Sequence, residues 1–180
     1  HKEYRRQRQM CIRDSAEATL AQLRGRIGRE AHSEWHRITQ DMVARYAELS
    51  GDGEGEWIHL DPERAAREAG YGGAIVQGFF QVSHLIKLSG EAMRSLLPFD
   101  TNHALNYGFD RLRFVRPMPV GARFRARVRI AEVTPKPGDS FLLKEALQLE
   151  LEDGTVTLAA DWLFFLGPRA LAGTFDAPPA

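Results

Sequence analysis

The sequence predicts an α+β fold in which an antiparallel sheet wraps around one long, largely buried central helix. Three observations lead to this expectation. Helical periodicity fills the first half of the chain up to Pro98, and alternation with a period of two fills the second half. The longest helical segment is also too continuously apolar for a surface helix. Helices followed by a run of strands are typical of α+β domains.

Composition limits the class of protein. The chain has 180 residues, of which 43% are apolar and 27% charged, as in a single globular domain. Lysine plus arginine and aspartate plus glutamate number 24 each, so no overall field favours nucleic acid or an anionic membrane. No apolar run has the length of a membrane span, and nothing resembles a signal peptide. The single Cys11 excludes an internal disulfide, so we expect a cytoplasmic protein.

The two ends of the chain differ from the rest. Residues 1–15 are basic, and their "MCIRDS" resembles a translated sequencing adapter. A nucleic-acid arm is the alternative interpretation. We expect residues 1–15 to be a non-native or disordered tail, so that Cys11 carries no function. The domain then spans residues 16–168, and residues 169–180 form a C-terminal tail.

Three helices are expected in order. The first follows Thr39 as N-cap and ends at Ser50-Gly51, with an apolar face made of Met42, Val43, Tyr46 and Leu49. In the second, Asp61 is the cap, Pro62 takes the first turn and Gly70 ends the helix. The long buried helix comes next, and its apolar positions are Phe79, Val82, Leu85, Ile86, Met93, Leu96 and Leu97.

Four strands follow Pro98. Alternating segments occupy residues 104–115, 122–133, 141–152 and 155–166, with turns at 117–121, 135–139 and 153–154. Asp153-Gly154 is a strong hairpin signal. We expect an antiparallel meander.

One stretch, "SGDGEGEWIHLDPERA" at residues 50–65, carries the candidate chemistry. Its turn holds Asp52, Glu54 and Glu56, and His59 follows directly after the apolar Trp57 and Ile58. One interpretation is a solvated loop that leads into a core histidine bonded by Asp61 or by a backbone carbonyl. The other is an acid and a base brought together around a substrate.

Five stretches together resemble a known family. They are residues 33–40, 46–52, 57–66, 71–85 and 105–128, within a likeness that extends from about Leu23 to Leu166. The chain resembles the MaoC-like dehydratases, which have the hotdog fold and include R-specific enoyl-CoA hydratases, and it is most similar to the NodN-like branch.

This resemblance implies specific roles. An aspartate after the first helix and a histidine downstream hold a water against the enoyl thioester, and Asp52 and His59 match them. A carboxyl and an imidazole shielded from solvent can hold opposite protonation states near neutral pH. Gly78 would offer its backbone N–H to the enolate oxygen, and its lack of a side chain would let the thioester carbonyl approach closely.

Two departures from the family pattern concern this site. Asp52 and His59 are seven positions apart, which is longer than the family spacing, while Glu54 lies five before His59. The acid is therefore Asp52, which keeps its relation to the helix end, or Glu54. A third possibility is that the longer loop misplaces both carboxylates. Gln77 stands where the family has histidine, and would supply a hydrogen bond to the substrate.

Other residues have a structural and a functional interpretation side by side. Ser83 either bonds back to its helix or lines the pocket, and Trp57 would narrow the acyl tunnel with Phe79 and Phe80. Histidines at 32, 36, 84 and 103 have no metal-site spacing. The arginine row (Arg123, Arg125, Arg127 and Arg129) lies on one sheet face, with Arg111, Arg113 and Arg116 nearby, and is either ion-paired or a landing site for coenzyme A phosphates.

The expected function is reversible hydration of a trans-2-enoyl-CoA to an (R)-3-hydroxyacyl-CoA in a homodimer. No metal or cofactor is expected beyond the coenzyme A of the substrate, and neither nucleic acid nor membrane is a partner. The alternatives are a dehydratase of acyl carrier protein substrates, a hotdog thioesterase, and a non-catalytic acyl-thioester-binding module.

Overall fold

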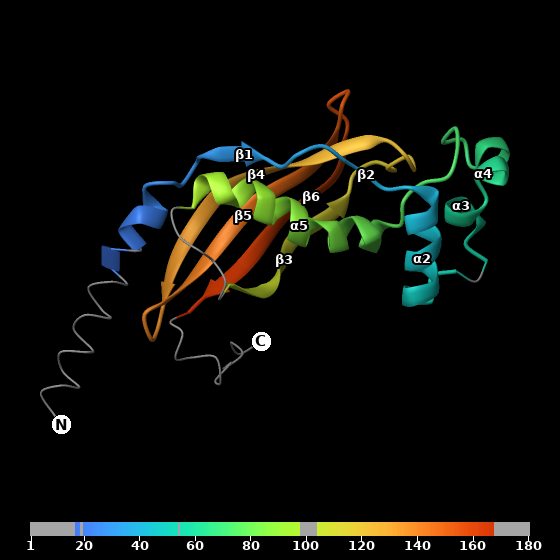
Figure 1. The fold of residues 1–180 in the computed structure, drawn as a ribbon. Coiled ribbons are helices and arrows are strands. Elements are labelled where there is room, and N and C mark those ends of the chain that lie inside the picture. The colour runs from blue at the N-terminus through green and yellow to red at the C-terminus, as the bar shows by residue number, and fades with distance from the viewer. Residues whose placement is uncertain (1–16, 19, 54, 98–103, 168–180) are drawn as a thin grey trace, which may run out of the picture.

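A computed structural model describes residues 17–18, 20–53, 55–97 and 104–167. Both expected tails therefore lie outside the described residues. The helices with fully described bounds are α2 (Gln40–Ser50), α3 (Trp57–Leu60), α4 (Pro62–Glu68) and α5 (Gly78–Leu96). The strands are β1 (Glu30–His32), β2 (His36–Arg37), β3 (Ala104–Phe114), β4 (Arg123–Lys136), β5 (Ser140–Leu151) and β6 (Val156–Leu166). Figure 1 shows α5 lying along the sheet, with α2, α3 and α4 grouped beyond one end.

The sheet is antiparallel with the order β1-β4-β5-β6-β3, and β2 also pairs with β4. The expected meander is confirmed for β4, β5 and β6 and is wrong for β3, which pairs with β6 instead of β4. The reason lies in the expected turn at 117–121. Met118 and Val120 hydrogen-bond to Val76 and Ala74, so this segment crosses the fold instead of reversing the chain.

The local signals for turns and caps are confirmed. Thr39 accepts a hydrogen bond from the Met42 N–H at 3.3 Å, and α2 ends at Gly51 with φ +77°. Asp61 caps α4 by accepting from the Arg64 N–H at 2.9 Å. The turn between β5 and β6 requires a residue in the left-handed conformation, and Gly154 adopts it with φ +83°.

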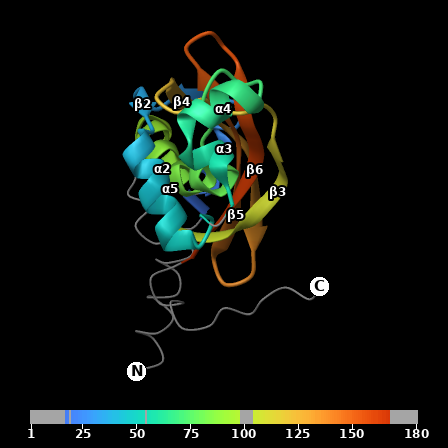
Figure 2. The same cartoon turned by 90° about the vertical axis from the view of Figure 1, so that its right-hand side faces the viewer.

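Two expectations about burial are wrong. Leu49 is 87% exposed, because the buried side of α2 is formed by Val43 and Ala47. In α5 the apolar Phe79 and Ile86 are 68% and 64% exposed, while the positions that face the sheet are buried. The helix packs against β4 and β1, and Figure 2 shows the sheet curving around it.

The core lies between α5 and the concave face of the sheet. Its largest fully buried side chains include Leu85 and Leu88 of α5 and Phe124, Ile130, Leu149 and Leu158 of the strands. None of the helices in the described residues is long and apolar enough to cross a membrane.

Candidate active site

His59 lies in the four-residue helix α3, where three contacts fix it. Its Nδ1 is 2.7 Å from the carbonyl oxygen of Ile75. Its own carbonyl accepts a hydrogen bond from Gln40 Nε2 at 2.7 Å, and the neighbouring Ile58 carbonyl accepts from the Ile75 N–H at 3.2 Å. The predicted hydrogen bond between the His59 ring and a backbone carbonyl is confirmed. Asp61 is occupied in capping α4.

This contact determines the protonation of the ring. A carbonyl oxygen only accepts hydrogen bonds, so Nδ1 must carry the proton. In the neutral ring Nε2 is then the basic nitrogen, and it is the atom that can take a proton from water. The hydrogen bond that holds the His59 ring in place therefore also makes Nε2 the nitrogen that can accept a proton.

Asp52 lies in the turn after α2 and is half-buried. Its backbone N–H donates to Ser50 Oγ at 3.3 Å. Among the described residues, no hydrogen bond or ion pair joins Asp52 to His59. If the two act together, a bridging molecule such as water must lie between them. Glu54, the alternative acid, lies outside the described residues.

Gly78 begins α5, so its N–H belongs to the first turn, where backbone N–H groups lack intrahelical partners. These groups, with the helix dipole, favour a developing negative charge. A Cβ on Gly78 would lie 2.8 Å from the Phe114 ring. Glycine is thus required by the packing of Phe114 over the start of the helix.

Gln77 is the N-cap residue of α5 and is 1% exposed. Its Nε2 donates to the Val43 carbonyl at 3.2 Å, which ties α2 to the start of α5. Its Oε1 has no partner within the described ranges. The structure places this side chain inside the protein, where it holds two elements together.

Ser83 and Trp57 also have structural partners. Ser83 Oγ donates to the Phe79 carbonyl at 3.0 Å, which is the back-bonding interpretation, while the residue also lines a cavity. Trp57 is half-buried, and the Arg64 guanidinium lies 4.4 Å from its ring centroid. No contact in the described part of the chain brings Trp57 to that cavity.

A cavity of about 480 Å³ runs beside the N-terminal half of α5. It is bounded by Tyr46 of α2, Phe79 and Ser83 of α5, and Phe109 of β3. The sequence carries no signal that places Phe109 at this cavity, because the β3–β6 pairing that brings it there is not a local property. Tyr46 lies on the expected apolar face of its helix and stacks on Phe80, with ring centroids 4.4 Å apart.

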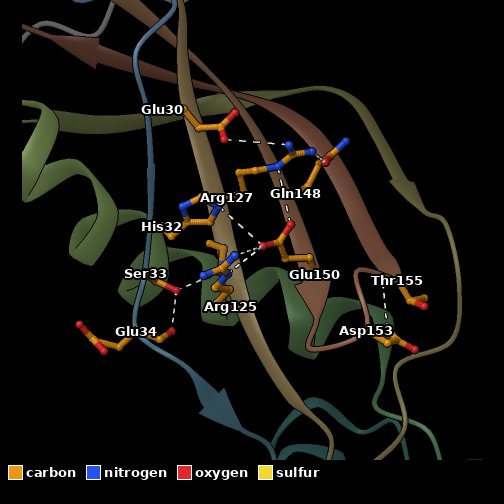
Figure 3. A network of polar contacts seen from close by, with 11 residues as sticks. Glu30, His32, Ser33, Glu34, Arg125, Arg127, Gln148, Glu150, Asp153 and Thr155 are labelled. Atoms are coloured by element: carbon orange, nitrogen blue, oxygen red, sulfur yellow. Dashed lines mark hydrogen bonds and ion pairs between the residues drawn. The ribbon is translucent and has the colours of Figure 1, made fainter.

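The arginine row lies on the outer face of the sheet and is largely ion-paired, as Figure 3 shows for two of its members. Arg125 reaches Glu150 at 2.7 Å, and Arg127 contacts the same carboxylate at 3.7 Å as well as Gln148. Arg123 pairs with Glu152, and Arg111 pairs with Asp161. This arrangement supports the ion-paired interpretation.

The histidines that the structure describes are bonded to other groups or lie apart. His36 Nε2 lies 2.8 Å from Glu91 Oε2, and His84 Nδ1 lies 3.1 Å from the Phe80 carbonyl. His103 lies outside the described residues. No cluster of potential metal ligands occurs in the described ranges.

Comparison with known proteins decides the family. The sequence matches the family described as "MaoC like domain" over residues 22–140. The chain belongs to the MaoC-like domain family. Nodulation protein N of Rhizobium leguminosarum bv. viciae is 32% identical over 149 residues, which are 82% of this chain and 90% of that protein. The 3-hydroxyacyl-thioester dehydratase Z of Mycobacterium tuberculosis (strain ATCC 25618 / H37Rv) is 39% identical over 94 residues, covering 52% of this chain and 58% of that protein.

Solved structures share the fold of this MaoC-like domain. The monoamine oxidase regulatory protein from Archaeoglobus fulgius has a TM-score of 0.65 at 22% identity, covering 78% of this chain and 89% of that one. The (R)-hydratase from A. caviae involved in PHA biosynthesis has a TM-score of 0.61 at 22% identity, covering 79% and 96%. The expected hotdog fold and MaoC-like membership are confirmed, and the family supports hydratase or dehydratase chemistry.

Proposed function

We propose that this MaoC-like domain catalyses the reversible hydration of a trans-2-enoyl-CoA to an (R)-3-hydroxyacyl-CoA. The observation that carries the proposal is the contact between His59 Nδ1 and the Ile75 carbonyl, because it leaves Nε2 as a base. Only three positions separate Ile75 from Gly78, so the residue that holds the base lies at most about 10 Å of chain from the N-terminus of α5. A base beside a cluster of backbone donors suits addition to a conjugated thioester.

In the proposed reaction His59 Nε2 removes a proton from water while the water oxygen bonds to the β-carbon. The electron pair of the double bond moves toward the thioester carbonyl, whose oxygen accepts a hydrogen bond from the Gly78 N–H. The carboxylic acid of Asp52 or Glu54 then gives its proton to the α-carbon, and the proton held by His59 passes through solvent to the resulting carboxylate, which restores both groups. The steps transfer only protons and one water, so neither a redox cofactor nor a metal is needed, and coenzyme A enters as part of the substrate.

The proposal includes a homodimer. Phe79 and Ile86 on α5 and Leu105 and Phe114 on β3 are exposed apolar residues, from 47% to 68% accessible. β3 is also an edge strand of the sheet. Apolar residues next to an open strand edge are features that a second copy would cover.

The test follows the absorbance of the conjugated thioester in crotonyl-CoA and in a longer trans-2-enoyl-CoA. We expect the band to disappear with the wild-type protein and to persist with His59→Ala. His32→Ala is the matched control, since it removes an exposed histidine of β1, and should behave as wild type. Turnover by a folded His59→Ala protein would overturn the assignment. Repeating the assay with the same acyl chain attached to an acyl carrier protein shows whether the protein prefers coenzyme A or the carrier protein.

A second candidate is an acyl-thioester-binding module without turnover. The lengthened loop between Asp52 and His59 favours it, because a displacement of about 1 Å in a catalytic site can cost about 100-fold in rate. Tight binding of an enoyl-CoA with no loss of its band, unchanged in His59→Ala, would select this candidate.

A further inference from the structure

One carboxyl interrupts the apolar inner face of β5. Alternate residues of this strand face α5, and they are Phe141, Leu143, Glu145, Leu147 and Leu149. Glu145 is 3% exposed, while no ion pair to it occurs in the described residues. A charge in this position is costly unless something binds it. The residue therefore needs an explanation that packing does not provide.

The surroundings of Glu145 are polar on two sides. Ser89 of α5 donates a hydrogen bond from Oγ to Glu145 Oε2 at 2.6 Å. Trp162 of β6 is the cross-strand neighbour of Glu145, and its Nε1 is buried without a partner in the described ranges. Burial raises the pKa of Glu145 to about 7, so near neutral pH the carboxyl both donates and accepts hydrogen bonds.

These groups line a cavity of about 240 Å³. Glu145, Ser89, Asn106 and Trp162 contribute to its wall, and the remainder is mainly apolar, with Leu143 and Phe164 among the lining residues. Ile86, Asn106 and Trp162 also line the 480 Å³ cavity near the start of α5. The two cavities therefore adjoin along the helix, with the polar cluster in the more distant one.

We propose that the distal cavity binds an acyl chain that carries a hydroxyl group, with Glu145 and Asn106 as its hydrogen-bonding partners. That this ligand is a thioester follows from the proposed hydratase function, on which this part of the proposal rests. A hydroxyl both donates and accepts, which matches a cavity wall that holds both a carboxyl and an amide. A plain methylene chain would offer no hydrogen bond to the carboxyl beyond the one from Ser89, and a carboxylate would be repelled by the ionised form of Glu145.

The length of α5 between Gly78 and Ser89 indicates which carbon of the acyl chain should carry the hydroxyl. Ser89 lies eleven residues after Gly78 in α5, which corresponds to about 16 Å. An extended carbon chain advances about 1.25 Å per bond, from a bond of about 1.5 Å and an angle of about 111°. A hydroxyl oxygen on the twelfth carbon lies twelve bonds, or about 15 Å, from a thioester carbonyl carbon at Gly78, which leaves it about one hydrogen-bond length from Glu145.

The experiment measures binding by calorimetry, using dodecanoyl-CoA and 12-hydroxydodecanoyl-CoA, which are saturated and cannot be hydrated. We expect the hydroxylated ester to bind about tenfold more tightly to the wild-type protein, as for one well-placed hydrogen bond. Glu145→Leu should abolish this ratio, and Glu145→Gln should retain part of it. Gln148→Leu is the matched control, on the same strand but on the outer face, and should keep the full ratio.

Equal or weaker binding of the hydroxylated ester to the wild-type protein would overturn the proposal, even if Glu145→Leu fails to fold. Tighter binding of 12-aminododecanoyl-CoA than of the hydroxylated ester would also overturn it, because the site would then select a cation. Hydration of an unsubstituted trans-2-enoyl-CoA, assayed on the same preparation, reports on the proposed function separately.

Discussion

The Nδ1 of His59 and the carbonyl oxygen of Ile75 are 2.7 Å apart, and this bond connects the candidate base to the segment that leads into α5. Ile75 is itself held by Ile58, whose carbonyl accepts its N–H at 3.2 Å. The short helix α3 and the segment that leads into α5 are therefore joined by two hydrogen bonds. The group that orients the imidazole is the backbone carbonyl of Ile75, so no substitution of the Ile75 side chain removes it.

Two amide substitutions at His59 should separate structure from chemistry. Asn places its amide near the position of Nδ1 and can still donate to Ile75, whereas Gln places its amide near Nε2 and cannot. We expect both variants to lose hydration activity by about 10²- to 10⁴-fold, the usual contribution of a general base. His59→Gln should also lose about 1 kcal/mol of unfolding free energy, while His59→Asn should not. Urea unfolding and the enoyl-CoA assay check the two effects.

The identity of the acid can be tested with two isosteric variants. Asp52→Asn and Glu54→Gln each remove one carboxyl and keep its shape. We expect Asp52→Asn to lower kcat by about 10²-fold or more and Glu54→Gln to change it by less than about threefold. The opposite order would assign the acid to Glu54. Equal small effects would show that neither carboxyl transfers the proton.

Phe114 and Gly78 should be energetically coupled. A methyl group at Gly78 would meet the Phe114 ring at 2.8 Å, so Gly78→Ala must displace that ring. We expect Gly78→Ala to lower kcat/KM by about tenfold or more, since small displacements at a donor are costly. Adding Phe114→Ala should restore part of the loss, and the double-mutant cycle gives the coupling. Strictly additive effects of the two substitutions would show that the loss in Gly78→Ala does not come from a clash with the Phe114 ring.

The buried Glu145 makes stability depend on pH. Its pKa is raised from the ordinary value of 4.5 to about 7 in the folded protein, mainly by burial. Between these values the folded state holds a proton that the unfolded state has lost, so the free energy of unfolding falls as pH rises through this window. The total loss is at most about 3 kcal/mol above pH 7.

Glu145→Gln removes this titration and provides the measurement. The difference in unfolding free energy between Glu145→Gln and wild type should be small near pH 5 and should grow in favour of the variant toward pH 8. Comparing the two proteins cancels the other titrating groups. A difference that stays constant between pH 5 and pH 8 would mean that the carboxyl is solvated in the folded protein.

The uncovered side of α5 should control assembly. Ile86 is 64% exposed, so Ile86→Lys costs little within one chain but places a charge in the proposed contact between copies. We expect sedimentation to shift from dimer to monomer with unchanged circular dichroism. Lys87→Ala, at the adjacent exposed position, is the control and should leave the dimer intact. A dimer that survives Ile86→Lys would place the interface elsewhere.

Features encoded by neighbouring residues were predictable from the sequence. Thr39 and Asp61 cap their helices as expected, and Asp153-Gly154 makes the hairpin, because each depends on a few adjacent residues. The four long strands are found close to their expected bounds for the same reason. The family resemblance added His59 and Asp52, which local pattern alone left ambiguous.

Features that depend on distant pairing were not predictable. β3 joins β6 because residues 117–121 bond to residues 74–76, far away in the sequence. The bond from His59 to Ile75 spans sixteen positions. Alternation along β5 places Glu145 on the same face as Leu143 and Leu147, but only the strand register and the packing of α5 show that it lies beside Trp162 and Ser89.

The one-sided attachment of α5 has an evolutionary consequence. Residues that hold the helix, such as Leu85 and Leu88, are fully buried, whereas Ile86 and Asn106 of the cavity wall are exposed. Substitutions at these two exposed wall positions should therefore change ligand preference at small cost to folding, because surface substitutions usually alter stability by less than about 0.5 kcal/mol. The buried wall residues Glu145 and Trp162 also belong to the interior of the fold, so relatives can diverge more readily at the exposed part of the wall than at the buried part.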